Sequence, residues 1–279
     1  MLRGLQRCVR GGAASVSLVL PESAAPATEN GLQIAMRGIV ESLYGPPVRR
    51  LPGLDIGRAY RGAEGEFRYG GDVVDVFHYG AGYTSLAVVD ITGHGMPAAR
   101  NAGLAKHALR AYASNYLDAA ECVRALNRLC IENSAFEGDV EFFATLFFAI
   151  VQPDRCTMEY VSAGHDAAYL IRSGETQVLG ATGPIIGLMD NDDAFERRLV
   201  QLSPGSIIAA VTDGFSEARD TNRVFLGPEA LADVVLRNAS RDAEEQAEAV
   251  TQCAYDYAGG MLHDDVAALV VKVAPQRWT

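Results

Sequence analysis

The sequence predicts an α+β fold, a sandwich of two mostly antiparallel sheets with helices on the outside. Segments rich in strand-forming residues come in consecutive runs and helical patterns come in pairs, whereas a parallel α/β fold would alternate the two strictly. Apolar residues make up 49% of the 279 positions, which is ample for a sizeable core. The sequence contains no internal repeat.

The first 46 residues are predicted to form an arm and one amphipathic helix ahead of the main domain. Residues 1–30 are rich in Gly, Ala, Ser and Pro and carry no sustained period, which is typical of a terminal arm. Apolar side chains then recur at helical spacing over residues 32–43, until Pro46-Pro47 ends the pattern. This helix could pack on the domain, contact a regulatory partner or form a homodimer, and the pattern leaves all three open.

Residues 47–279 are predicted to form one domain, which opens with strands. Three neighbouring strands rich in β-formers are expected at residues 54–61, 73–79 and 83–91. Two helical patterns follow back to back at residues 97–115 and 119–133. Asp118 is the expected N-cap of the second helix, because its side chain can accept hydrogen bonds from the first turn.

Strands return in the second half of the domain, in a mostly antiparallel run. They are expected at residues 143–152, 157–163, 167–172, 195–202 and 206–212. Two helices and a last strand are then expected at residues 228–238, 243–257 and 266–273.

Charge and cysteine content exclude several classes of function. With 24 basic and 35 acidic residues the net charge is -11, so nucleic acid and anionic membranes are not expected partners. No apolar stretch approaches the length of about 18 to 20 residues that a membrane-spanning helix needs. The five cysteines are odd in number, scattered and without a C-x-x-C pair, which indicates a reducing cytoplasm rather than a disulfide framework or zinc site.

Four short acidic motifs stand at predicted strand ends, next to glycine or another acid. They are Gly70-Gly71-Asp72, Asp90-Ile91-Thr92-Gly93-His94-Gly95, Thr212-Asp213-Gly214 and Asp264-Asp265. Any one of them is compatible with an ordinary turn, because Asp and Gly both favour turns. Hard divalent cations such as Mg²⁺ and Mn²⁺ need several carboxylate oxygens from distant parts of a chain, and strand ends can supply that convergence.

These motifs belong to a longer collinear pattern that resembles the metal-dependent protein phosphatases (PPM family), specifically the bacterial SpoIIE and RsbU branch. The resemblance covers roughly residues 47–274. It is carried by Leu51-Pro-Gly-Leu-Asp-Ile, Gly70-Gly-Asp-Val-Val-Asp-Val-Phe, Asp90-Ile-Thr-Gly-His-Gly, Phe143-Ala-Thr-Leu-Phe, Ser162-Ala-Gly-His, Gly183-Pro-Ile-Ile-Gly, Pro204-Gly-Ser, Thr212-Asp-Gly-Phe-Ser-Glu-Ala-Arg, Phe225-Leu-Gly and Asp264-Asp-Val. It implies an αββα sandwich with two Mn²⁺ or Mg²⁺ ions at one end of the sheets, and a serine/threonine phosphatase that uses metal-activated water.

The resemblance also implies roles for individual residues. Asp90 corresponds to the carboxylate that bridges both cations, and the carbonyl of Ile91 to an additional ligand. Asp213 and Asp264 would complete the first cation site, and Asp72 would be an outer ligand. In this branch the usual substrate is a phosphoserine or phosphothreonine on a STAS-domain protein of the anti-anti-sigma kind, within a partner-switching pathway.

Two histidines and two departures from the family's pattern lie close to these positions. His94, between two glycines, could protonate the leaving group or hold the geometry by hydrogen bonds, and His165 is expected to support a loop. Asp166-Ala167-Ala168 stands where the family commonly has prolines, and Asp265-Val266-Ala267 lacks the usual threonine. No arginine matches the phosphate-binding arginine of eukaryotic relatives, so the cations themselves would hold the phosphate.

Three alternative functions compete with this interpretation. Gly93-His94-Gly95-Met96-Pro97-Ala98 fits the dinucleotide-binding pattern, but a second helix follows where a parallel strand is required. The C-x5-R spacing from Cys122 to Arg128 is that of cysteine-dependent phosphatases, yet the stretch lacks glycine and favours a helix with Cys122 buried. A catalytically silent phosphatase-like binding module has no support, because every acidic position that the resemblance requires is filled.

Overall fold

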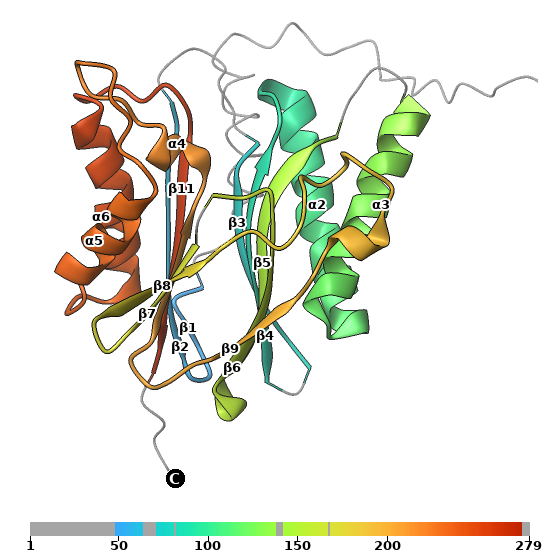
Figure 1. The fold of residues 1–279 in the computed structure, drawn as a ribbon, viewed down its shortest axis with the longest axis horizontal. Helices are drawn as coiled ribbons and strands as arrows, with labels where there is room; N and C mark the ends of the chain where they lie inside the picture. Colours follow the sequence, from blue (N-terminus) through green and yellow to red (C-terminus); the bar gives the residue numbers. More distant parts are fainter. Residues whose placement is uncertain (1–47, 64–70, 81, 138–141, 167, 275–279) are drawn as a thin grey trace, which may run out of the picture.

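The computed structural model describes residues 48–63, 71–80, 82–137, 142–166 and 168–274. The predicted arm and helix within residues 1–46 lie outside the described residues, as does Gly70 of the first acidic motif. The described chain forms two antiparallel sheets packed face to face between pairs of helices (Figure 1). The predicted αββα sandwich is confirmed.

The larger sheet has six strands in the order β1-β2-β11-β10-β7-β8, and all its pairs are antiparallel. Its strands are β1 (Arg50–Leu51), β2 (Leu54–Arg61), β7 (Ala168–Arg172), β8 (Glu175–Leu179), β10 (Ile207–Val211) and β11 (Val266–Val273). The pairing of β2 with β11 runs from Leu54 opposite Val273 to Arg61 opposite Val266. The first and last long strands of the described chain therefore lie side by side.

The smaller sheet has five strands in the order β3-β4-β5-β6-β9, again all antiparallel. Its strands are β3 (Val73–Tyr79), β4 (Tyr83–Ile91), β5 (Ala144–Gln152), β6 (Thr157–Ala163) and β9 (Arg198–Gln201). The register of β4 and β5 places Asp90 opposite Thr145. This pair lies at the end of the sheet where the acidic motifs gather.

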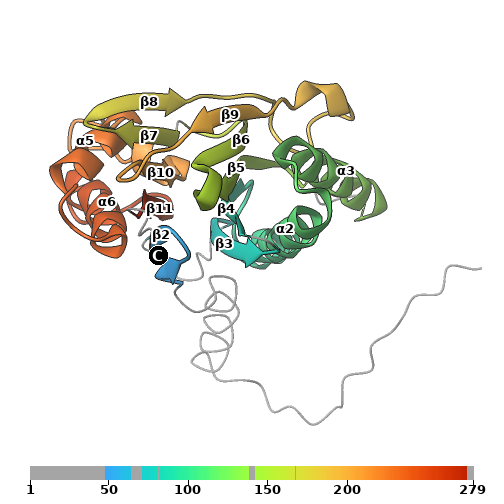
Figure 2. The same ribbon diagram turned by 90° about the horizontal axis from the view of Figure 1, so that it is seen from below.

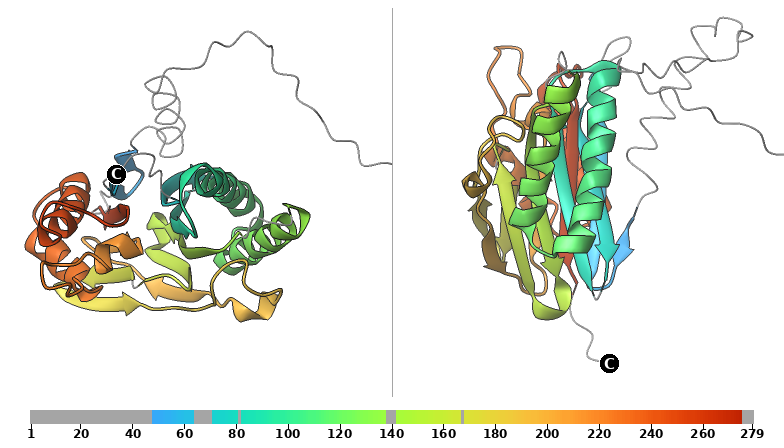
Figure 3. Two further views of the ribbon diagram at one scale, coloured as in Figure 1. Left: turned by 90° about the horizontal axis from the view of Figure 1, so that it is seen from above. Right: turned by 90° about the vertical axis from the view of Figure 1, so that its right-hand side faces the viewer.

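Helices cover the outer face of each sheet (Figures 2 and 3). On the five-stranded sheet lie α2 (Gly95–Tyr116) and α3 (Ala119–Glu137), and on the six-stranded sheet lie α5 (Glu229–Arg237) and α6 (Ala243–Tyr257). The short helix α4 (Asp213–Ser216) follows β10 directly, and the 3₁₀ turns are η1 (Pro153–Arg155) and η2 (Asp192–Ala194).

Three apolar layers hold the sandwich together, and β4 contributes to two of them. Leu86 and Val88 belong to the layer between the two sheets, whereas Ala87 and Val89 belong to the layer under α2 and α3. This division follows from the strand itself, because successive side chains point to opposite faces. A third layer lies between the six-stranded sheet and the helices α5 and α6.

Most predicted elements are confirmed, several with the expected bounds. The strands at residues 54–61, 73–79, 83–91, 157–163 and 266–273 and the helix at residues 243–257 agree with the prediction. Asp118 is the N-cap of α3, because its Oδ1 accepts hydrogen bonds from the backbone N–H groups of Ala120 at 2.9 Å and Glu121 at 3.1 Å.

The structure corrects two strand predictions. The first predicted strand, β2, is not a neighbour of β3 and β4, because it pairs with β11 in the other sheet. The strand expected over residues 195–202 is confined to β9. Phe195 is instead fully buried in the layer under α2 and α3, so its apolar character reflects core packing rather than a strand.

Strand β8 was missed because it lies at the edge of its sheet and carries exposed residues. Glu175, Thr176, Gln177 and Val178 are all exposed, so the segment lacks the apolar pattern of a buried strand. A two-residue turn connects it to β7, and both turn residues have positive φ, 50° at Ser173 and 83° at Gly174. Turns with positive φ at both positions suit the twist of a β-hairpin.

Asp75, which shares a sequence motif with Asp72, has a structural role. The Arg110 guanidinium of α2 donates two hydrogen bonds to its carboxylate, at 2.7 and 2.6 Å. Lys106 lies 3.8 Å from the same carboxylate, and both Asp75 and Lys106 are buried. A bidentate contact fixes orientation as well as distance, so this group holds α2 on β3.

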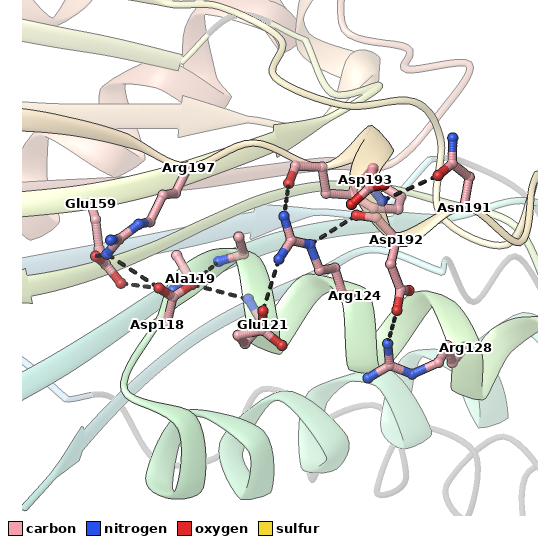
Figure 4. Close-up of polar contacts among 12 residues, drawn as sticks. Asp118, Ala119, Glu121, Arg124, Arg128, Glu159, Asn191, Asp192, Asp193 and Arg197 are labelled. Atoms are coloured by element: carbon pink, nitrogen blue, oxygen red, sulfur yellow. Dashed lines mark hydrogen bonds and ion pairs between the residues drawn. The ribbon is translucent and has the colours of Figure 1, made fainter.

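A polar network fastens the segment around η2 to α3 (Figure 4). The guanidinium of Arg124 donates to the backbone carbonyls of Asp192 at 2.8 Å and Phe195 at 2.9 Å. Arg128, one helical turn further on, pairs with the side chain of Asp192. The segment that leads into β9 is thereby held against the helix.

Candidate metal centre

The four acidic motifs lie at one end of the sandwich, where β3 and β11 begin and β4 and β10 end. In the five-stranded sheet Val73 pairs with Val89, which brings the residue before β3 to the end of β4. In the six-stranded sheet Val211 pairs with Ala268, which brings the residues after β10 to the start of β11. The motifs therefore form two acidic pairs, one in each sheet.

Gly71 allows the close backbone approach that brings together the first acidic pair, Asp72 and Asp90. A Cβ on Gly71 would lie 2.5 Å from the carbonyl oxygen of Ile91 and 2.7 Å from the Cβ of Ile91. Only glycine permits this approach. It places the buried Asp72 beside the half-buried Asp90, and the two carboxyl groups share a hydrogen bond.

Gly214 sets the second acidic pair, which consists of Asp213 and Asp264. A Cβ on Gly214 would lie 2.0 Å from the carbonyl oxygen of Asp265, so this position also requires glycine. Asp265 is buried and accepts a hydrogen bond from the backbone N–H of Ala63 at 2.7 Å. Asp264 is exposed, and its Oδ1 accepts the backbone N–H of Asp265 at 2.8 Å.

Thr212 connects the two acidic pairs across the sheets. Its fully buried hydroxyl donates a hydrogen bond to the carboxylate of Asp72 and accepts one from the backbone N–H of Ala267 at 2.9 Å. Asp90 of the smaller sheet also senses the charge of Asp213 from the larger sheet. The four carboxylates are therefore electrostatic neighbours.

Burial and mutual repulsion oppose the simultaneous ionisation of these groups. Burial, followed by the charges of Asp213 and Asp264, raises the pKa of Asp90 from 3.8 to about 7. Burial, with the charges of Asp264 and Glu217, raises the pKa of Asp213 to about 6. Burial and the charge of Asp90 raise the pKa of Asp72 well above its ordinary value. The charged side chains that raise the pKa of Asp90 most, Asp213 and Asp264, are themselves carboxylates.

A divalent cation fits this set of donors. Carboxylate oxygens are the hard ligands that Mg²⁺ and Mn²⁺ prefer, and positive charge would relieve the repulsion. The carbonyl of Ile91, beside Gly71, is a further oxygen donor at the same end of the sheet. Among the described residues, no three Asp, Glu, His or Cys side chains are gathered closely enough to form a finished ligand shell.

Three polar residues that the sequence analysis did not assign to the site belong to its surroundings. The charge of Asp166, in the loop between β6 and β7, acts on both Asp90 and Asp213. The hydroxyl of Ser216 donates a hydrogen bond to Asp166, and Thr212 bonds Asp72. In the sequence, Asp166 could be noticed because it departs from the family's pattern. Thr212 and Ser216 lie in a motif that was selected for Asp213, so nothing in the sequence pointed to their hydroxyl groups.

The two histidines of the predicted site differ in their surroundings. His94 is the exposed N-cap residue of α2, and its side chain makes no capping hydrogen bond. Its part in catalysis remains a prediction. His165 is buried, its Nδ1 lies 2.9 Å from Oγ1 of Thr145, and burial lowers its pKa to about 4. A neutral, hydrogen-bonded ring agrees with the predicted supporting role.

Neither alternative site signature forms the structure that its chemistry needs. The glycines from Gly93 to Gly95 do precede a helix, but the next strand, β5, runs antiparallel to β4. A dinucleotide-binding unit requires a parallel strand there. Cys122 is fully buried on α3, and burial raises the pKa of its thiol to about 12, so it is not a nucleophile.

A surface concavity of about 580 Å³ lies away from the carboxylates, between β2 and α6. Its lining includes Arg58, Arg61 and Arg241, together with Glu245 and Glu248. Because both signs of charge are present, the concavity has no clear preference for an ion.

Sequence comparison identifies similar proteins. The profile of the SpoIIE family, stage II sporulation protein E, matches residues 80–274. Protein IcfG of Synechocystis sp. is 27% identical over 198 residues, which cover 62% of this chain and 31% of IcfG. Phosphoserine phosphatase RsbU of Bacillus subtilis is 24% identical over 190 residues, which cover 67% of this chain and 55% of RsbU. The chain thus spans about a third to a half of the curated relatives it matches.

Solved structures show the same fold. The RsbU and RsbW domains of Rv1364c from Mycobacterium tuberculosis superpose with a TM-score of 0.68 and 26% identity, over 81% of this chain and 61% of that chain. RsbX in complex with magnesium superposes with a TM-score of 0.61 and 16% identity, over 82% of this chain and 99% of that chain.

Proposed function

Because the chain belongs to the SpoIIE family, we propose that it is a metal-dependent protein serine/threonine phosphatase. The family match over residues 80–274 includes three of the four acidic motifs, and the fourth, at Asp72, lies just ahead of it. The similar protein RsbU carries the name phosphoserine phosphatase. The substrates are accordingly phosphoserine and phosphothreonine side chains.

The observation that carries this proposal is the convergence of the two acidic pairs from different sheets. Each pair depends on a glycine that lets a backbone approach a carbonyl oxygen, at Gly71 and at Gly214. The resulting cluster is rich in carboxylate oxygens, and burial together with mutual repulsion raises the pKa values of Asp72, Asp90 and Asp213. Perturbed carboxylates in such a cluster are typical of functional sites.

We assign the carboxylates as the sequence resemblance suggests. Asp90 would contribute oxygens to two cations, with the carbonyl of Ile91 as an additional ligand. Asp213 and Asp264 would complete the first cation site, and Asp72 would be an outer ligand. The central position of Asp90, which senses carboxylates of both sheets, supports its bridging role.

Two bound Mg²⁺ or Mn²⁺ ions would supply the positive charge that activates water and neutralises the phosphoryl oxygens. The protein's own contribution is to hold the carboxylates in place. Thr212 orients Asp72 through its hydroxyl, and the backbone N–H of Asp265 orients Asp264. A magnesium complex of the structural neighbour RsbX agrees with this choice of ion.

For the substrate protein we propose a phosphorylated STAS-domain protein in a partner-switching pathway. Support comes from the resemblance of the sequence to the RsbU branch and from Rv1364c, in which an RsbU domain accompanies an RsbW domain. A regulatory partner or a second copy of the chain would act through the predicted helix of residues 32–43, outside the described residues.

We place this reaction in the cytoplasm, because the four described cysteines are free thiols. Within the described ranges, no helix has both the length and the apolar character to cross a bilayer.

A phosphatase assay tests the proposal. The full chain is incubated with a phosphoserine peptide and with phosphorylated STAS-domain proteins, in Mn²⁺, in Mg²⁺ and in excess chelator. Turnover is expected only when a divalent cation is present. Full activity in chelator would contradict the metal mechanism. Calorimetric binding of Mn²⁺ without turnover of any phosphoprotein would instead indicate the silent binding module.

A further inference from the structure

The loop between β6 and β7 passes from one sheet to the other beside the candidate metal centre. Strand β6 belongs to the five-stranded sheet and β7 to the six-stranded sheet. Two consecutive polar residues, His165 and Asp166, stand in this loop. Each contacts one half of the centre.

His165 contacts the half that contains Asp90. Its Nδ1 lies 2.9 Å from Oγ1 of Thr145, the residue that pairs directly with Asp90 in the register of β4 and β5. The His165 ring is buried, and its Nε2 makes no hydrogen bond of good geometry to a described residue. The backbone carbonyl of Val211 lies close enough to raise the pKa of the ring, but this effect is smaller than that of burial. Thr145 is thus the side chain to which His165 is hydrogen-bonded.

Asp166 contacts the half that contains Asp213. Its carboxylate accepts a hydrogen bond from the hydroxyl of Ser216, the last residue of α4. The same hydroxyl oxygen lies 3.1 Å from the carbonyl oxygen of Asp213, the first residue of α4. Ser216 is buried, so water does not readily replace these contacts.

We infer that His165 and Asp166 form a link that sets the spacing between Asp90 and Asp213, and thereby the affinity of the centre for divalent cations. This inference rests on the proposed function of the carboxylates. The two link residues share a peptide bond, so their Cα atoms are about 3.8 Å apart and neither end can move freely of the other. Metal–oxygen distances of about 2.0–2.2 Å leave little tolerance in the spacing of ligands from different sheets.

Asp166 also adds negative charge to the centre, and this effect must be separated from the link. Asp166→Asn removes the charge but retains an oxygen that can accept the Ser216 hydroxyl. Ser216→Ala does the reverse, since it removes the hydroxyl and leaves the charge. The link predicts that Ser216→Ala weakens cation binding more than Asp166→Asn does.

The test is a calorimetric titration of the metal-free full chain with Mn²⁺. Ser216→Ala and Thr145→Val each remove one end of the link and are expected to weaken Mn²⁺ binding about tenfold, as losses of supporting hydrogen bonds around metal sites do. The double variant with Ser216→Ala and Thr145→Val is expected to bind Mn²⁺ about as tightly as the single variant with the lower affinity. A link that is broken at one end is already lost, so breaking the other end has no further effect. Thr145→Ser, which keeps the hydroxyl, is expected to restore the wild-type affinity.

Matched controls exist elsewhere in the chain. Thr84→Val breaks a histidine–threonine contact of the same kind, between His78 Nδ1 and Thr84 Oγ1 at 3.1 Å, at the opposite end of β4. Ser114→Ala removes a helical serine whose hydroxyl donates to the carbonyl of Arg110 at 2.9 Å. Both controls should bind Mn²⁺ with the wild-type affinity.

The outcomes separate this inference from the proposed function. If the wild-type protein does not bind Mn²⁺, the proposed function fails. If it binds Mn²⁺ and both single variants stay within about twofold of it, only the link is refuted, since a tenfold loss was expected. A double variant whose loss equals the product of the single losses also refutes the link, because the two contacts then act independently. A larger loss in Asp166→Asn than in Ser216→Ala also refutes the link, because Asp166 then acts through its charge.

Discussion

Asp90 lies where the two sheets meet, and its ionisation depends on residues from both. It shares a hydrogen bond with Asp72 of its own sheet and is repelled by Asp213 and Asp264 of the other. This electrostatic position supports the proposal that Asp90 would hold both cations.

We predict that Asp90→Asn lowers turnover about 100-fold or more while the fold is retained, because an amide offers a single neutral acceptor in place of two charged oxygens. Without metal the variant should melt at the same or a higher temperature, since one repulsive charge is gone. With saturating Mn²⁺ the order should reverse, because the wild-type protein binds the ion more tightly. Thermal melts and a phosphatase assay check this. Near-normal turnover would refute the two-metal assignment.

The carboxylates also predict how pH affects the metal-free protein. The pKa of Asp90 is about 7 and that of Asp213 about 6, both above the ordinary 3.8, so the native state binds more protons than the unfolded state from about pH 4 to 7. The free energy of unfolding should therefore fall as pH rises through this window. Saturating Mn²⁺ should flatten or invert this slope, because the bound ion keeps the carboxylates ionised. Denaturant titrations at several pH values, with and without Mn²⁺, measure it, and parallel profiles would contradict the prediction.

At the level of single elements, the approach of α4 to β11 depends on Gly214. We predict that Gly214→Ala destabilises the protein by about 1–3 kcal/mol, because the new methyl group would lie 2.0 Å from a backbone oxygen and force α4 away from β11. Mn²⁺ binding should weaken as well, since Asp213 moves with α4. Denaturant unfolding and calorimetry test both effects.

Gly180→Ala is the matched control, because a Cβ there meets no atom within 4 Å. This variant should unfold at nearly the wild-type denaturant concentration and bind Mn²⁺ normally. Equal effects of the two substitutions would show that the close approach at Gly214 is unimportant.

The elements differ in how far the sequence predicts them. Buried strands such as β3 and β4 are rich in β-forming residues and lie between glycines, and they were predicted with their bounds. The edge strand β8 was not predicted, because its exposed residues show no hydrophobic period that distinguishes a strand from a loop. The sequence also did not predict that β2 belongs to the larger sheet. Its pairing with β11 joins segments that are far apart in the sequence, and a local pattern does not reveal such pairing.

The site shows the same division. Its aspartates were predicted because acid–glycine motifs at strand ends can be read from the sequence. The contacts that hold them were not, because a Ser216 hydroxyl that bonds Asp166 exists only after α4 meets the loop between β6 and β7. A serine or threonine inside a motif gives no sign of which partner its hydroxyl will find.

For the molecule as a whole, three apolar layers join the two sheets and the helices within the part of the chain that the structure describes. We predict that deletion of residues 1–45 leaves a folded domain that binds Mn²⁺, because none of these layers is lost. Oligomeric state or regulation should change, since the predicted amphipathic helix is removed. Light scattering measures the oligomeric state of the deletion variant, and basal kinetics measure its regulation. If neither value changes, the predicted helix has no role in oligomerisation or regulation.

The pairing of β2 with β11 has a consequence for biosynthesis. Roughly 200 residues separate these strands, so at about 5–20 residues per second a ribosome needs about 10–40 s to make β11 after β2 has emerged. Asp264 is made in the same late stretch, immediately before β11. A nascent chain can therefore neither close its larger sheet nor complete its carboxylate cluster until the stretch from Asp264 to the end of β11 has been made, and the proposed phosphatase stays inactive until then.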